Sequence, residues 1–67
     1  MNMIPVHNSS NVVAIGYDGT NVRVQFKSGI YLYHNVPINV WDNFQNSSSK
    51  GEFVHHTLKR YPATKIG

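Results

Sequence analysis

The sequence predicts an α+β fold in which a three-stranded antiparallel β-meander is followed by two short helices. Three apolar segments rich in β-branched and aromatic residues come first, and tight-turn dipeptides separate them. Two segments with apolar residues at helical spacing follow. A chain of 67 residues is long enough for one domain. We expect that domain at residues 9–67, after a flexible lead-in at residues 1–8.

The expected strands cover residues 11–17, 22–27 and 30–36. The first and third are rich in β-branched or aromatic side chains. The second alternates apolar with polar residues, as a half-buried strand does. Asp18-Gly19 and Ser28-Gly29 separate the segments and are typical of tight hairpin turns, in which glycine accommodates positive φ angles.

Alternation along these strands predicts two faces of the sheet. A two-residue loop at Ser28-Gly29 would set Phe26 opposite Tyr31, and directly opposed residues share a face. A one-residue change of register would exchange the two faces of a strand. The predicted inner face carries Val13, Ile15, Tyr17, Val22, Val24, Phe26, Tyr31 and Tyr33. The predicted outer face carries Val12, Ala14, Arg23, Gln25, Lys27, Ile30, Leu32 and His34.

Two helices are expected after the meander. Pro37 suits the first turn of a helix, and apolar residues at helical spacing continue it to about residue 46. Ser49 and Glu52 have the spacing of a capping box and predict a second helix over about residues 50–59. The proline at position 62 stops that helix. The tail that follows either pairs as a strand or stays loose.

The composition limits the classes of protein and of partner. The net charge is +3, from six Lys and Arg against three acids, and it favours anionic partners. These cations are scattered, whereas a dedicated nucleic-acid binder carries a denser basic stripe. The absence of cysteine excludes disulfides and cysteine-ligated zinc. We expect a cytoplasmic protein, because the chain has no signal-peptide pattern and no apolar run of the ~20 residues that a membrane span needs.

The residues for catalysis or metal binding are few, and we expect neither an enzyme nor a bound cofactor. The acids have structural roles, with Asp18 in a turn, Asp42 on a solvated helix face and Glu52 in a cap. Adjacent helical residues point about 100° apart, so His55 and His56 are poorly arranged to chelate one ion. We therefore expect no metal site, with the histidines exposed or at helix ends.

Three groups of residues are candidates for holding a ligand. Ser48, Ser49, Lys50 and Gly51 combine hydroxyls, a cation and a helix start and suit a phosphate, although a plain capped helix has the same pattern. Tyr31, near the hairpin tip, either stacks on a base or joins the core with Tyr33, Trp41 and Phe44. Lys59, Arg60 and Tyr61, with Lys65 nearby, suit recognition of a phosphate and a base, although cations in the last turn of a helix also complement its dipole. His55 of the same helix is a further candidate.

The outer sheet face is the expected oligomer interface. A chain this short buries a marginal core, and oligomerisation is one way to add burial. Apolar residues on a face expected to meet water indicate a partner surface. The residues expected at this interface are Val12, Arg23, Ile30, Leu32 and His34.

The order of motifs resembles the KTSC domain family over about residues 9–66. Ser10-Asn11 followed by residues 14–18 resembles the opening of that domain, and Phe26-Lys27-Ser28-Gly29 followed by Tyr31-Leu32-Tyr33 resembles its central stretch. Residues 49–51, Phe53, Leu58 and Tyr61 resemble its C-terminal half. His55-His56 departs from a stretch that is more polar in other members.

The resemblance implies a domain found at the C-terminus of some lysyl-tRNA synthetases and as a free-standing protein in bacteria and phages. RNA binding has been suggested for the family from the synthetase context. Our preferred hypothesis is a non-enzymatic module that binds a small nucleotide-like ligand carrying phosphate, such as a phage protein that sequesters a nucleotide immune signal of its host. An RNA-binding domain and a protein–protein adaptor are the alternatives.

Overall fold

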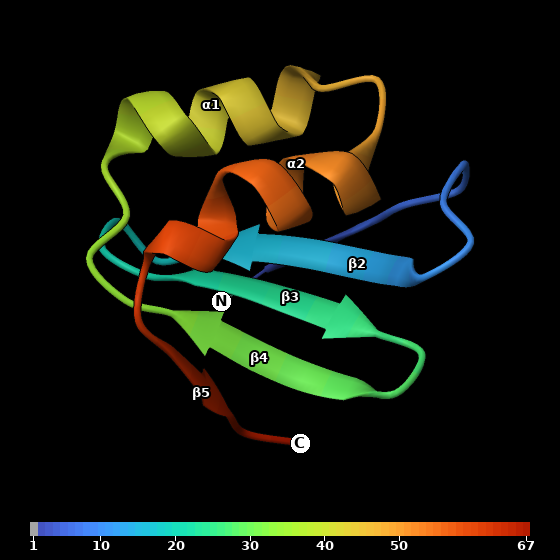
Figure 1. Cartoon of the computed structure of the whole chain (residues 1–67), viewed down its shortest axis with the longest axis horizontal. Coiled ribbons are helices and arrows are strands. Elements are labelled where there is room, and N and C mark those ends of the chain that lie inside the picture. The colour runs from blue at the N-terminus through green and yellow to red at the C-terminus, as the bar shows by residue number, and fades with distance from the viewer. Residues whose placement is uncertain (1) are drawn as a thin grey trace.

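Five antiparallel strands form one sheet in the order in which they occur along the chain (Figure 1). This computed structural model describes residues 2–67, so Met1 of the expected lead-in lies outside it. The strands are β1 (Met3–Pro5), β2 (Val12–Tyr17), β3 (Val22–Phe26), β4 (Gly29–Tyr33) and β5 (Ala63–Lys65). The α+β class and the antiparallel sheet are confirmed. The prediction of three strands was wrong, because the lead-in supplies β1 and the tail supplies β5.

The β2–β3 turn is longer than the expected two-residue loop, and the β3–β4 turn is shifted by one residue along the chain. Phe26 pairs with Gly29, so the β3–β4 loop is Lys27–Ser28 and Tyr31 lies opposite Val24. The β2–β3 loop spans residues 18–21, because Tyr17 pairs with Val22. Each pairing differs from the prediction by two residues. An even shift leaves each side chain on its predicted face, so the assignments for β3 and β4 hold.

A β-bulge in β2 reverses the predicted faces of its first residues. Val12 pairs with Phe26 and Ala14 with Gln25, so Val13 is an extra residue with no partner of its own on β3. Val12 is consequently 1% exposed and lies in the core, whereas Val13 is 39% exposed. The predicted positions of Val12 on the outer face and Val13 on the inner face were therefore both wrong.

Two helices lie on the same side of the sheet (Figure 1). Helix α1 (Ile38–Asn46) begins after Pro37 as predicted. Helix α2 (Lys50–His56) begins after Ser49, whose Oγ accepts the Glu52 amide at 3.3 Å. The α-helix ends three residues before the predicted position 59, and the chain continues as the 3₁₀ turn η1 (Leu58–Arg60).

The core lies between the middle strands and the helices. Tyr17 stacks on Trp41 with ring centroids 5.3 Å apart, and its hydroxyl donates to the Val36 carbonyl at 2.6 Å. Phe44 stacks on Phe53 at 5.1 Å and joins the two helices. The buried core residues are Val12, Ile15, Val22, Val24, Tyr33, Val36, Trp41, Phe44 and Leu58.

The inner face is covered unevenly from the centre of the sheet to its edges. Val22, Val24 and Tyr33 are buried under the helices. Phe26 and Tyr31, near the β3–β4 hairpin, are half-buried, and every residue of β5 is exposed. At the other edge, Ile4 of β1 is 42% exposed. Two parts of the inner face therefore remain accessible, one at each edge of the sheet.

Candidate functional site

Two aromatic side chains meet on the accessible part of the inner face near the β3–β4 hairpin. Phe26 and Tyr31 contact edge to face, with ring centroids 5.7 Å apart and planes at 77°. Phe26 lies opposite Gly29, which has no side chain, so Tyr31 on the same face approaches Phe26 diagonally. The half-buried pair packs against the core on one side and leaves aromatic surface open on the other.

One lysine lies beside Tyr31, and another follows Phe26 along the chain. Lys65 of β5 pairs in register with Tyr31 and shares its face. Its side chain runs over Gly29, because a Cβ built on that glycine would lie 2.9 Å from Lys65 Cε. Lys27 and Phe26, which are adjacent in the sequence, both line a hollow of about 270 Å³ beside the hairpin. We name Phe26, Lys27, Tyr31 and Lys65 the aromatic–lysine surface.

No acidic side chain contributes to the aromatic–lysine surface. Asp18 lies in the β2–β3 turn, at the other end of β3, while Asp42 is on α1 and Glu52 is in the first turn of α2. Both lysine side chains of this surface are exposed. Exposed cations beside open aromatic rings suit a ligand that combines a planar base with phosphate.

The predicted serine–lysine anion site is divided between two hollows. Ser48 and Ser49 line an open hollow of about 330 Å³ that is also lined by Glu52. Lys50 lines a different pocket, and its Nζ donates to the Ser47 carbonyl at 2.6 Å. A Cβ on Gly51 would meet no atom within 4 Å, so this glycine is open to solvent. The four predicted residues therefore do not converge on one pocket.

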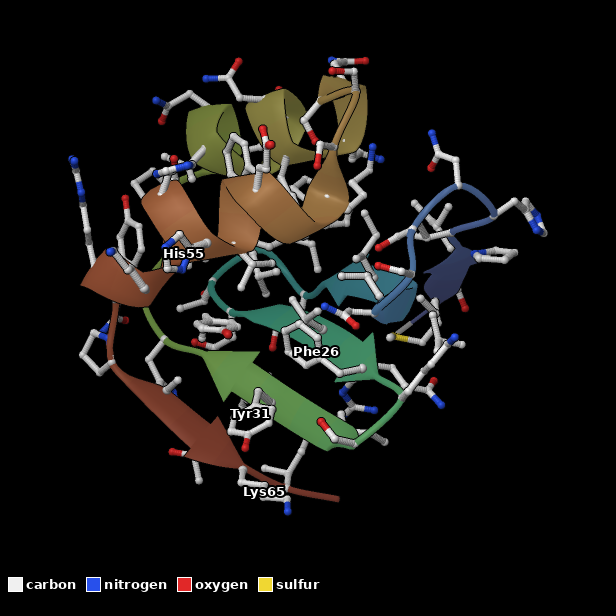
Figure 2. All side chains as sticks on the ribbon, turned by 45° about the vertical axis from the view of Figure 1, so that its right-hand side comes forward. Phe26, Tyr31, His55 and Lys65 are labelled. Carbon is white, nitrogen blue, oxygen red and sulfur yellow. The ribbon has the colours of Figure 1, made fainter. Side chains whose placement is uncertain are left out.

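The other predicted ligand residues lie along α2 and η1. Tyr31 belongs to the aromatic–lysine surface, and Figure 2 shows His55 on α2 on the same side of the molecule. Lys59 and Arg60 are exposed on η1, beyond the end of α2. The rings of His55 and His56 contact at 5.2 Å between centroids. Among the residues that the structure describes, no three His, Cys, Asp or Glu side chains gather in a way that could hold a metal ion.

A family model described as the KTSC domain matches residues 8–61. The chain belongs to the KTSC domain family. Among solved structures, the crystal structure of the KTSC domain protein YPO2434 from Yersinia pestis matches with a TM-score of 0.91 at 36% sequence identity. The match covers 98% of this chain and 97% of that chain. No curated protein matches.

The KTSC match contains part of the aromatic–lysine surface. Phe26, Lys27 and Tyr31 fall within the matched residues 8–61, whereas Lys65 lies beyond them. Tyr31 was a predicted ligand candidate, and Phe26 was predicted on the inner face. Lys65 was predicted near Lys59 and Arg60 rather than beside Tyr31. The pairing of the tail with β4 brings Lys65 beside Tyr31, and no local pattern in the sequence marks that contact.

The outer face of the KTSC sheet carries four of the five residues predicted for the oligomer interface. Arg23, Ile30, Leu32 and His34 are half-exposed there, and Val12 is excluded because it is buried in the core. His34 Nε2 lies 2.8 Å from Thr64 Oγ1 on β5. The Nε of Arg23 is buried and has no hydrogen-bond partner in the described part of the chain.

No helix among residues 2–67 is long and apolar enough to cross a membrane.

Proposed function

We propose that this KTSC domain is a non-enzymatic binding module for a phosphate-bearing nucleotide ligand. The base stacks on Tyr31 and Phe26, and the phosphate group meets the ammonium groups of Lys65 and Lys27. The observation that carries the proposal is the edge-to-face aromatic pair, with Lys65 paired beside Tyr31, Lys27 next to Phe26 and no acidic side chain among these residues. Stacking on aromatic side chains contributes about 1–3 kcal/mol per base and tolerates any base, so it adds affinity to the contacts of the cations.

RNA binding is the second candidate, and the openness of the surface favours it. The aromatic pair lies on an accessible sheet face near two chain turns, so a strand longer than one nucleotide has room to continue past it. Salt dependence separates the two ligands. A strand that contacts several phosphates loses affinity steeply as salt rises, while a single nucleotide with one or two phosphate contacts loses little.

Sequestration of a host nucleotide signal by a phage is the most specific form of the proposal. A sequestering protein needs affinity without turnover. The small size of the chain, its net charge of +3 and its few acids agree with binding alone. The same reasoning applies to any free-standing KTSC domain that holds a nucleotide without cleaving it.

Calorimetric titration of the purified protein tests the proposal. The probes are adenosine monophosphate, ADP-ribose, a cyclic dinucleotide and a short single-stranded RNA, each at low and at moderate salt. We expect at least one nucleotide to bind, and the probe to be recovered unchanged after incubation. We expect Tyr31→Ala to weaken binding at least about tenfold, because it removes a stacking platform. Tyr31→Phe should retain most of the affinity.

A charge-matched pair of variants locates the phosphate contact. Lys65→Gln removes an ammonium beside Tyr31, and Lys59→Gln removes one from η1. The proposal predicts weaker binding for Lys65→Gln and unchanged binding for Lys59→Gln. Weaker binding for Lys59→Gln with unchanged binding for Lys65→Gln would instead assign the ligand to the η1 end of the molecule. Binding of none of the probes, or their hydrolysis by the pure protein, would contradict the proposal.

A further inference from the structure

A pocket of about 360 Å³ lies at the opposite edge of the sheet, beside β1. We propose that this β1 pocket is a second ligand site, for a small molecule with an apolar body and one carboxylate. The pocket shares no lining residue with the aromatic–lysine surface, so the two sites are independent. Its volume is at the lower end of the range in which proteins bind small molecules.

The apolar wall of the β1 pocket is formed by paired strands. Ile4 of β1 pairs in register with Ile15 of β2, and both side chains line the pocket. Beyond the end of β1, the Val6 amide donates to the Val13 carbonyl at 2.9 Å and keeps Val6 beside β2. Ile15 is 1% exposed, so the apolar surface extends inward to the core. This wall would contact an apolar ligand without any rearrangement of the backbone.

The polar wall comes from the two helices. Gln45 lies at the end of α1, and Lys50 is the first residue of α2. Lys50 Nζ donates to the Ser47 carbonyl at 2.6 Å, which fixes the ammonium at the pocket wall. An ammonium has three donor hydrogens, so two remain for a ligand. None of the lining residues is acidic. His7 and Asn8, in the segment after β1, add further polar groups to the pocket wall.

This combination selects a monoanion with a hydrophobic body. One ammonium compensates one negative charge, whereas a dianionic phosphate would bring a second charge into a largely apolar pocket without a partner. A carboxylate also accepts hydrogen bonds from both the Lys50 ammonium and an amide group of the pocket wall. A neutral apolar molecule would leave the ammonium facing the pocket without an anion.

An NMR titration with 4-phenylbutyrate and the matched alcohol 4-phenylbutanol tests this inference. We expect the carboxylate to shift the amide signals of Val6, Ile15, Gln45 and Lys50 and to bind at least tenfold more tightly than the alcohol. Lys50→Gln should reduce carboxylate affinity to that of the alcohol, and Lys50→Arg should restore it. Equal affinity for acid and alcohol would overturn the assignment of a carboxylate.

A pocket-filling variant keeps the test independent of the Ser47 contact. Ile4 is 42% exposed, so Ile4→Trp adds volume to the pocket without replacing a core residue. This variant should abolish binding of both probes, while Ile38→Trp at a site 65% exposed on α1 should leave it unchanged. Tyr31→Ala should also leave it unchanged. Binding that survives Ile4→Trp, or no shift at millimolar probe, would overturn the inference.

Discussion

Gly29 controls how the C-terminal tail packs on the sheet. Its φ is 155°, and a Cβ there would lie 2.8 Å from the Gly67 carbonyl oxygen and 2.9 Å from Lys65 Cε. Gly29→Ala should therefore lower the free energy of unfolding by about 1–3 kcal/mol, because it adds backbone strain and displaces the tail. Thermal unfolding measures this. Gly51→Ala is the control: its Cβ would meet nothing within 4 Å, and alanine favours helix by up to about 1 kcal/mol. Equal effects of the two variants would contradict this account.

Asp18 makes the β2–β3 turn sensitive to acid. The amides of Asn21 and Thr20 donate to its carboxylate at 2.6 and 2.9 Å, and they hold the pKa of Asp18 below its usual value. A lowered pKa means that the stabilisation is present at neutral pH and is lost as the pH falls below 4 through the folded-state pKa. The free energy of unfolding of the Asp18→Asn variant should depend less on pH between pH 5 and pH 2 than that of the wild type. An unchanged profile would show that the carboxylate does not stabilise the turn.

The bulge in β2 makes the effects of two adjacent valines opposite to those expected from simple alternation. Val12→Ala should reduce the free energy of unfolding by about 2 kcal/mol, because it opens a cavity in the core. Val13→Ala should change it by less than about 0.5 kcal/mol, since Val13 is exposed. Denaturant unfolding of both variants measures the difference. A larger loss for Val13→Ala would place the bulge elsewhere.

Elements with strong local signals were predictable from the sequence, and weakly marked ones were not. The alternation of β3, Pro37 before α1 and the Ser49–Glu52 cap each correspond to a local interaction that the structure contains. β1 and β5 have three residues each, too few for a clear alternation, so their pairing depends on context from the partner strands β2 and β4. The bulge at Val13 also depends on the register with β3, which no residue type in β2 marks. Tyr31 and Lys65 were both named as candidates, but their pairing across β4 and β5 was not predicted.

The whole molecule has one sheet face covered by helices and one uncovered. The uncovered face carries Ile30 and Leu32, and the directly paired Thr64 of β5 shares that face with Leu32. A sheet with helices on one face is already a two-layer fold, and an antiparallel sheet can face water on its other side. We propose that the half-exposed apolar residues of this face nevertheless pack on a second copy of the chain. Light scattering after size exclusion should then give the mass of a dimer. Leu32→Lys should shift the protein to monomer, and a monomeric wild type at high concentration would refute this proposal.

The position of a bound nucleotide on the molecule tests the central claim most directly. An NMR titration of the labelled protein with ADP-ribose reports every perturbed residue at once. We predict that the aromatic ring signals of Phe26 and Tyr31 and the side-chain signal of Lys65 shift together and saturate with one dissociation constant. Shifts confined to residues 48–51 or to Lys59 and Arg60, with the Phe26 and Tyr31 rings unaffected, would contradict the claim.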